Sequence, residues 1–503
     1  MNRIFFFITA LFLPLLSHAQ DWKAILNEFE QYAQESMQAS KTVGSSVAIV
    51  KDGKVVYAKG FGERSLQDKQ PVTPDTIFQI GSLSKSFTTA LTAIAVDRKL
   101  LNWEDPVIRW MPTFLMYDPW VTRGYLIEDL YAQRSGLVPY AGDYQASLGV
   151  TIDQIVANVR YFQPITSFRS SFAYENVFFS VGAQVLHNTT GKDWQSLIQE
   201  EFFQPLGMKS SSYTLASYLK TPNRVGWHEL KPNGAVQLLP DTMEGGDAPY
   251  IYAASGGINS TILDMAKWII MQTDQGMYLG KQIVSKENLA RTHRPNIYAF
   301  NRDNHSLYYC MGWISEEYSP YPIIWHNGGT FGVSTNMAII PEERLGIVVL
   351  CNTRGSVVAE SLTMKFFDLY FGKPKTDWTK KMMAIVQDVF KKELAKHPPI
   401  AKPLPALPLN AYTGTYSNPV YGDLVVTVKG GELVGEIGPK KTQWIFKHYN
   451  RDTFSLWWPP IEDGSNKVLF YMDAENKPSQ VFIEALAGEN QGLFVKKAET
   501  VKS

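Results

Sequence analysis

The chain has 503 residues, of which 48 are Lys or Arg and 48 are Asp or Glu, so its formal net charge is zero. A neutral chain has no basic field that holds phosphate groups, which argues against nucleic acid as a partner. Its length exceeds one ordinary domain, and 45% apolar residues suffice for a large core and a second, smaller one. The two cysteines, Cys310 and Cys351, exclude a disulfide framework and allow one bridge at most.

Residues 1–20 have the pattern of a secretory signal peptide. Arg3 precedes an apolar stretch at residues 4–16, and the small residues Ser17 and Ala19 lie three positions and one position before a cleavage site near Gln20. No later apolar run reaches the ~20 residues that a membrane-spanning helix needs. We therefore expect an exported protein, periplasmic or secreted, with no integral membrane segment after cleavage. An uncleaved anchor is the alternative.

The first chemical motif follows a helix predicted at residues 22–40 and two predicted strands. Gly81-Ser82-Leu83-Ser84-Lys85 joins an apolar run to a long helical pattern. Residues i and i+3 share a helix face, so Lys85 would project its amine beside the Ser82 hydroxyl. A buried lysine of lowered pKa can remove the proton of a serine hydroxyl, which makes Ser82 a candidate nucleophile.

This spacing is weak evidence by itself, because Ser217 and Lys220 repeat it without a preceding apolar strand and glycine. The structural alternative for Ser82 and Lys85 is an N-cap serine with a solvent-facing lysine one turn later. The remaining motifs decide between these interpretations.

The second motif, Tyr174-Glu175-Asn176, lies in the region of residues 100–250, for which we predict mixed helix and loop. A phenol with neighbouring cations can titrate low enough to shuttle protons, and an amide can hold a lysine and a substrate carbonyl together. Tyr416 and Asn418 repeat the spacing far along the chain, in a tail of different composition, and are expected to be structural.

The third motif contains His326, Gly328 and Gly329 at the end of a predicted strand, in residues 305–352, where strands return. Glycines lack a Cβ and let the backbone approach a ligand, so their N–H groups can point at a developing oxyanion. A lone histidine before two glycines is typical of a turn, so this motif too depends on the others.

The three motifs, in this order and spacing, resemble the serine β-lactamase and penicillin-binding-protein superfamily, in the branch of class C β-lactamases, D-aminopeptidases and related esterases. The resemblance covers roughly residues 40–370. It implies an α+β fold, with an antiparallel sheet flanked by helices plus a helical region, over residues 21–395. In that fold the strands near Cys310 and Cys351 are not adjacent, so we expect two buried thiols.

The resemblance also implies roles for the motif residues. Ser82 would be the nucleophile, Lys85 its activating partner and Tyr174 the proton shuttle to the leaving group, while Asn176 would position Lys85 and the substrate. Whether Lys85 or Tyr174 is the base of acylation stays open at this point, as it does for class A relatives. No cofactor is implied.

The third motif would bind substrate through His326 and Gly328, and the backbone N–H groups of Ser82 and Gly329 would form the oxyanion hole. Many relatives have Lys-Thr-Gly here, with a fixed positive charge for a substrate carboxylate. His326 replaces that lysine, and an imidazole is mostly neutral at pH 7, so we expect weaker carboxylate binding.

The C-terminal part has another composition. Residues 362–395 are predicted to be helical, and residues 396–408 form a proline-rich linker. Residues 409–503 contain short alternating runs between turn residues, typical of an all-β domain, and their start is similar to lipocalin-like or sandwich modules of this hydrolase branch. Shaping the active-site entrance, contacting cell-wall polymer and stabilising the catalytic domain remain open as its role.

We therefore predict an exported serine hydrolase that forms an acyl-enzyme on Ser82. Its substrate would be a small molecule or peptide with an amide or ester, such as a D-amino-acid peptide, a β-lactam or a small ester. No G-x-S-x-G elbow, H-E-x-x-H pair or Cys/His cluster is present, which disfavours an α/β-hydrolase and a metal site. The alternative is a non-catalytic or slowly acylated penicillin-binding sensor of the cell wall.

Overall fold

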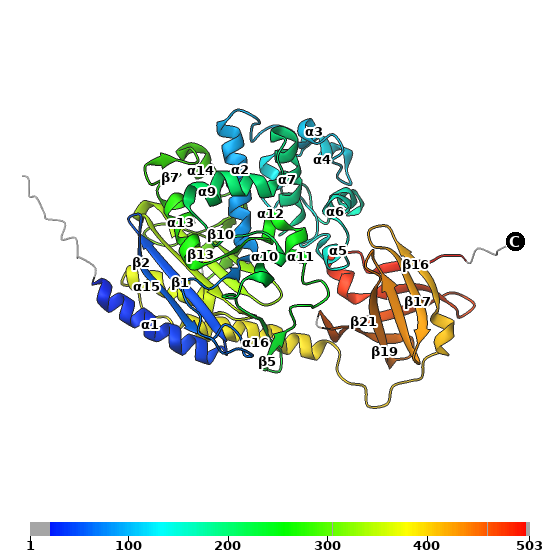
Figure 1. Cartoon of the computed structure of the whole chain (residues 1–503). Helices are drawn as coiled ribbons and strands as arrows, with labels where there is room; N and C mark the ends of the chain where they lie inside the picture. Colours follow the sequence, from blue (N-terminus) through cyan, green and yellow to red (C-terminus); the bar gives the residue numbers. More distant parts are fainter. Residues whose placement is uncertain (1–20, 304, 460, 499–503) are drawn as a thin grey trace, which may run out of the picture.

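The computed structural model describes residues 21–303, 305–459 and 461–498, and the predicted signal peptide at residues 1–20 lies outside them. In the described part, the catalytic region is built on an eight-stranded sheet of order β2-β1-β14-β13-β12-β11-β10-β9 (Figure 1). All neighbours in it are antiparallel. Its strands are β1 (Gly44–Lys51), β2 (Lys54–Gly62), β9 (Ile297–Arg302), β10 (His305–Tyr309), β11 (Ile314–Glu316), β12 (Ile323–Gly329), β13 (Ser334–Ile340) and β14 (Leu345–Cys351).

Helices cover both faces of this sheet, which explains why its central strands are apolar at nearly every position. On β1, Val47 and Ile49 pack into one core while Ala48 and Val50 pack into the other, because successive side chains point to opposite faces. The first core includes residues of α1 (Trp22–Ala39) and α15 (Val358–Tyr370); the second includes residues of α2 (Ser84–Asp97), α7 (Val177–Thr190) and α13 (Ile262–Thr273). The predicted α+β fold is confirmed.

The helix predicted at residues 22–40 is confirmed by α1, and most of the stretch predicted to be helical at residues 362–395 is helical, with a break that was not predicted. Two helices occupy this stretch, α15 and α16 (Trp378–Lys396). Gly372 lies just beyond α15 with a φ of 62°, a left-handed conformation that ends helices, and Pro374 follows it. These two residues divide the helical stretch into two helices.

The helical region between the sheet strands consists of short elements, as predicted for residues 100–250. They are α3 (Val107–Trp110), α4 (Pro119–Gly124), α5 (Asp143–Ser147), α6 (Ile152–Asn158), α7, α8 (Trp194–Ile198), α9 (Gln204–Leu206), α10 (Leu215–Lys220), α11 (Ala248–Ile251), α12 (Ala253–Gly256) and α14 (Lys286–Thr292). Short strand pairs lie beside them: β3 (Phe78–Gln79) with β6 (Asn259–Ser260), β7 (Met277–Tyr278) with β8 (Lys281–Gln282), and β15 (Thr353–Arg354) with β4 (Trp227–Leu230) and β5 (Val236–Leu239).

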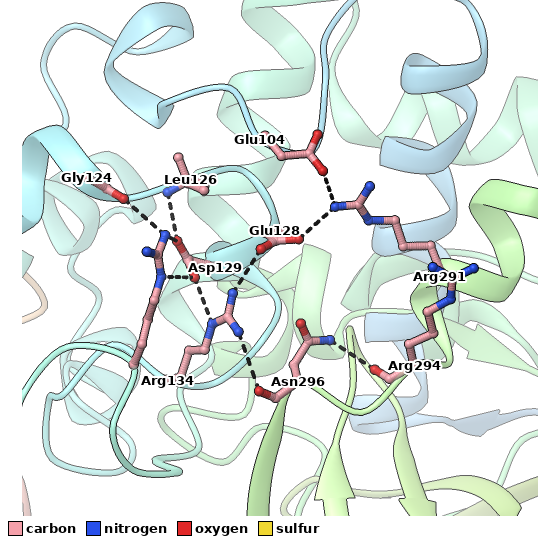
Figure 2. A network of polar contacts seen from close by, with 10 residues as sticks. Glu104, Gly124, Leu126, Glu128, Asp129, Arg134, Arg291, Arg294 and Asn296 are labelled. Carbon is pink, nitrogen blue, oxygen red and sulfur yellow. Dashed lines mark hydrogen bonds and ion pairs between the residues drawn. The ribbon is translucent and has the colours of Figure 1, made fainter.

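An ion-pair network ties this region to α14 and the chain just before β9 (Figure 2). Arg134 bonds Asp129 at 2.8 Å and Glu128 at 3.0 Å, and it also donates to the carbonyl of Asn296. Arg291 of α14 bonds Glu128 from the other side at 2.9 Å. Asp129 has a fully buried side chain, so the network fixes the segment around Arg134 against the sheet.

The C-terminal part is a closed barrel, which agrees with the lipocalin-like alternative and not with a sandwich. Its strands follow chain order, and β16 pairs with β23 to close it. They are β16 (Gly414–Asn418), β17 (Gly422–Lys429), β18 (Glu432–Ile437), β19 (Thr442–Asn450), β20 (Thr453–Trp458), β21 (Glu462–Met472), β22 (Pro478–Ile483) and β23 (Leu493–Lys496). The inside is filled by apolar side chains, among them Trp444, Phe454 and Phe470. Tyr416, the second Y-x-N tyrosine, is buried there.

Residues 397–408 connect α16 to the barrel, and Glu484 of the barrel bonds both Lys396 and His397. Within the catalytic region, Cys310 and Cys351 are buried free thiols near non-adjacent strands, as predicted. Among the described residues, no helix is long and apolar enough to cross a membrane.

Candidate active site

Ser82 lies in a short 3₁₀ helix, Gly81–Leu83, between β3 and α2. The turn is tight because Gly81 has a φ of 54°, and a Cβ on it would lie 2.7 Å from the backbone N of Gly329. Only glycine permits this close approach of the nucleophile turn to β12. The turn therefore places Ser82 beside the third motif.

Lys85 lies one turn further along, and its side chain is completely buried. Its Nζ is 3.1 Å from Ser82 Oγ, 2.6 Å from Asn176 Oδ1 and 3.2 Å from the Ser255 carbonyl oxygen. Burial lowers the pKa of Lys85 to about 7, although the Asp143 charge opposes the fall. The alternative of a solvent-facing lysine is wrong, and a neutral amine is accessible near neutral pH.

Tyr174 donates its hydroxyl to Ser82 Oγ at 2.7 Å. Lys85 is its nearest cation, with Nζ 4.8 Å from the centre of the ring. Burial nevertheless raises the pKa of Tyr174 far above its ordinary value. The prediction that this phenol titrates low is wrong, because the effect of burial outweighs that of the hydrogen bond with Ser82, which lowers the pKa. Tyr174 is therefore a neutral phenol whose hydroxyl donates a hydrogen bond to Ser82.

The loop that carries Tyr174 is held through the residue after it. Glu175 donates its backbone N–H to Gln133 Oε1 at 2.5 Å, and Gln133 Nε2 donates to the Glu175 carbonyl at 2.8 Å. Ser135 donates its hydroxyl to the Glu175 carboxyl group. Gln133 and Ser135 flank Arg134, so the network of Figure 2 anchors the segment that positions Tyr174.

Asn176 connects the lysine to a carboxyl group that the motifs did not indicate. Its Oδ1 accepts from Lys85, and its Nδ2 donates to Asp143 Oδ2 at 2.6 Å. Asp143 begins α5, in a part of the sequence where none of the three motifs lies. No pattern in the sequence links it to Asn176, and only the fold brings the two side chains together.

β12 brings the two glycines of the third motif against Ser82. A Cβ on Gly328 would lie 3.0 Å from the Ser82 backbone N and 2.4 Å from the Ile80 carbonyl oxygen, so the two backbones are in direct contact. The N–H groups of Ser82 and Gly329 thus belong to backbones that face each other, which is the arrangement expected of an oxyanion hole.

His326 lies on β12 but is completely buried behind this surface. Its Nδ1 lies 2.5 Å from the Asn327 carbonyl oxygen, and its Nε2 lies 3.0 Å from the Tyr309 hydroxyl. Burial, helped by the Lys85 charge, lowers the pKa of His326 to about 3. The imidazole is therefore neutral, and both of its nitrogens already have protein partners.

A cavity of about 860 Å³ opens at Ser82 and is lined by residues of both domains. Tyr174, Asn176 and Gly328 line it from the catalytic domain, as do the charged residues Arg354 and Glu360. Its barrel residues are Ile461, Glu462, Ser465 and Asn466. The barrel thus forms part of the cavity wall.

The second S-x-x-K pair, Ser217 and Lys220, lacks the burial of the first pair. Ser217 and Lys220 are both exposed on α10, and Ser217 Oγ accepts from Thr214 at 2.7 Å. The same spacing therefore produces an ordinary helix surface where no strand, phenol or amide converges on it.

A serine hydroxyl held between a buried amine and a buried phenol, beside facing backbone amides, defines a site for acyl transfer through serine. The family model described as Beta-lactamase matches residues 29–365, so the chain belongs to the beta-lactamase family. A second model, Domain of unknown function (DUF3471), matches residues 398–494, which include barrel strands β16 to β22 and the start of β23.

Relatives and solved structures agree with this assignment. Unguisins hydrolase ungD' of Aspergillus campestris is 27% identical over 427 residues, covering 79% of this chain and 77% of that protein. Penicillin-binding protein 4* of Bacillus subtilis is 24% identical, and the match covers 68% of this chain and 75% of that protein. An octameric penicillin-binding protein homologue from Pyrococcus abyssi superposes with a TM-score of 0.62 at 22% identity, covering 91% and 98%, and shows a shared fold. The chain is a serine hydrolase of this family.

Proposed function

We propose that the protein hydrolyses an amide or ester through an acyl-enzyme on Ser82, with Lys85 as the base of acylation. The hydrogen-bond pattern around Lys85 carries this proposal. A neutral amine has two N–H groups and one lone pair. Asn176 Oδ1 and the Ser255 carbonyl accept the two N–H groups, which leaves the lone pair for the Ser82 hydroxyl proton.

Tyr174 fits the second proton transfer. It already donates to Ser82 Oγ, so the Ser82 proton has Lys85 as its remaining partner. In acylation, Ser82 Oγ attacks the substrate carbonyl carbon while its proton passes to Lys85. The N–H groups of Ser82 and Gly329 stabilise the oxyanion. When the bond to the leaving group breaks, Tyr174 gives that group its proton and receives one from Lys85, and water later hydrolyses the acyl-serine.

The charges around the cavity bear on the substrate. His326 is neutral, and Glu360 adds a carboxyl group that accepts from the Asn327 side chain at 3.3 Å. Arg354 is the basic residue of the lining, and its guanidinium lies 3.7 Å from Glu229. This balance favours D-amino-acid peptides and small esters over β-lactams, whose carboxylate would meet no fixed charge at the third motif.

A slowly acylated penicillin-binding sensor is the second candidate, and the similarity to penicillin-binding protein 4* favours it. The name of the Aspergillus relatives, unguisins hydrolase, supports turnover instead. Export, to the periplasm or the medium, rests on the signal pattern of residues 1–20. Cell-wall polymer as a contact of the barrel stays a proposal of the same kind.

Turnover assays test the function directly. Wild-type protein and Ser82→Ala are incubated with a D-alanyl p-nitroanilide, a p-nitrophenyl ester and a penicillin, and product release is followed. We expect multiple turnovers of the amide or the ester that Ser82→Ala abolishes. A single stoichiometric burst with penicillin and no turnover of any substrate would favour the sensor, and equal turnover in Ser82→Ala would exclude the mechanism.

A further inference from the structure

The barrel contacts the catalytic domain at the segment that holds Asn176. Glu489 ends a short 3₁₀ helix of the barrel, Glu484–Glu489, and is only 4% exposed. Its carboxylate accepts the backbone N–H groups of Gly142 and Tyr144, both at 3.1 Å, and the hydroxyl of Tyr421 at 2.5 Å. The segment Gly142–Tyr144 includes the start of α5, and Figure 1 shows α5 beside the barrel.

Asp143 lies between the two residues whose N–H groups Glu489 binds. One of its oxygens, Oδ2, accepts from Asn176, and the other, Oδ1, is buried with no hydrogen-bond partner in the described part of the chain. Asn176 in turn accepts from Lys85. A continuous series of contacts therefore runs from the barrel carboxylate to the catalytic amine.

The segment has further contacts with the barrel that hold it in place. The Tyr144 hydroxyl donates to Glu462 of β21. Asn158 of α6 donates to the Val420 carbonyl at 3.3 Å, and Lys440 pairs with Asp247 at 2.8 Å. The interface is thus a set of specific polar contacts around α5, and Glu489, one of its buried carboxyl groups, binds the residues on either side of Asp143.

Two ionisable groups of opposite charge type face Asp143: the amine of Lys85 from α2 and the carboxyl group of Glu489 from the barrel. Burial raises the pKa of Glu489, and the hydrogen bonds from Tyr421, Tyr144 and Gly142 oppose this rise. The other titratable neighbours are Tyr140, Tyr174, Tyr252 and Glu175, and burial raises the pKa of each, which favours their neutral forms. Burial and the Glu489 charge raise the pKa of Asp143 to about 7, while Lys85 and Asn176 act in the other direction.

We propose that Asp143 is a positioning residue that orients Asn176 and Lys85, and that Glu489 positions Asp143, so that the barrel is part of the catalytic machinery. This inference rests on the proposed acyl-serine chemistry. It assigns the barrel a role at the active site beyond forming part of the cavity wall.

The proposal predicts shifts of opposite sign in the pH dependence of Ser82 labelling. Asp143→Asn keeps an acceptor for Asn176 but removes the charge that favours protonated Lys85, so the pH at which labelling reaches half its maximum falls. Glu489→Gln removes the charge that disfavours ionised Asp143, so Lys85 holds its proton more tightly and the midpoint rises. Each shift should be on the order of half a pH unit or more.

The experiment measures the second-order rate of labelling by a fluorophosphonate between pH 5.5 and 9 for the full-length protein and its variants. The double variant Asp143→Asn/Glu489→Gln should have the same midpoint as Asp143→Asn alone, because Glu489 acts through Asp143. Glu484→Gln is the matched control, since Glu484 begins the same short helix but binds Lys396 and His397, and its midpoint should equal that of the wild type. If Glu489→Gln does not fold, Tyr421→Phe is the substitute. It removes a hydrogen bond that stabilises ionised Glu489, so it should also raise the midpoint.

Unshifted midpoints in both single variants, or shifts of the same sign, would overturn the inference while leaving the acyl-serine chemistry intact. Absence of labelling in the wild type would overturn the proposed function and this inference with it.

Discussion

Replacing Lys85 by methionine separates the role of this residue in catalysis from its effect on stability. Burial lowers the pKa of Lys85 from its ordinary 10.5 to about 7. At 1.36 kcal/mol per pH unit, the folded state disfavours the charged amine by about 5 kcal/mol. Below pH 7 the wild type bears this whole cost. Between pH 7 and 10.5 the unfolded chain binds the proton that the folded chain has lost, so stability rises with pH.

The difference in unfolding free energy between wild type and Lys85→Met should therefore move in favour of the wild type by about 2 kcal/mol from pH 7 to pH 9. Asp143 adds a term of the same sign, because it loses a stabilising cation in the variant and its pKa rises. Urea unfolding followed by tryptophan fluorescence measures the difference at each pH. Fluorophosphonate labelling of the variant should fall by ~10²-fold or more.

Parallel stability profiles of the two proteins, with a difference that stays constant across this pH range, would refute the lowered pKa of Lys85. Undiminished labelling of Lys85→Met would refute its role as the base. The two readouts are independent, so either can fail without the other.

Three further substitutions probe other parts of the site. Tyr174→Phe removes the hydroxyl donated to Ser82 and should lower kcat by ~10²-fold in steady-state assays, whereas unchanged turnover would exclude a proton transfer through it. Gly81→Ala places a Cβ 2.7 Å from the Gly329 N and should slow fluorophosphonate labelling at least ~10-fold. Gly372→Ala is the control, because Gly372 has a similar φ with open space around it, and this variant should be labelled at the wild-type rate. Equal rates in the two variants would contradict the close approach of Gly81 to β12. Glu360→Gln keeps the acceptor for Asn327 but removes a negative charge from the cavity, so stopped-flow acylation by penicillin should become several-fold faster, and an unchanged rate would show that Glu360 does not select the substrate.

The contact between Ser82 and Lys85 could be predicted because its geometry is mostly local. Ser82 and Lys85 are three residues apart on one helical stretch, so helix geometry alone places the amine beside the hydroxyl. The order of the three motifs then supplied the long-range part through the resemblance to a known fold. The contacts of Lys85 with Ser82 and Asn176 in the structure agree with that prediction.

The remaining features depend on burial and on the packing of distant segments. The pKa of Tyr174 was predicted in the wrong direction, since a sequence shows a neighbouring cation but not how completely a phenol is removed from water. Asp143 and Glu489 carry no motif, and they meet through an interface between two domains. The break after α15 was predictable in principle from Gly372 and Pro374, which are ordinary helix-ending signals.

The central claim is that Ser82 is the residue that becomes acylated. Intact-protein mass spectrometry after treatment with a fluorophosphonate, and separately with a penicillin, tests it on the wild type, on Ser82→Ala and on Ser217→Ala, whose serine belongs to the exposed S-x-x-K pair. We predict one added phosphonyl mass in the wild type and in Ser217→Ala, and none in Ser82→Ala. A phosphonyl adduct that persists in Ser82→Ala, or that is lost in Ser217→Ala, would contradict the assignment of the nucleophile.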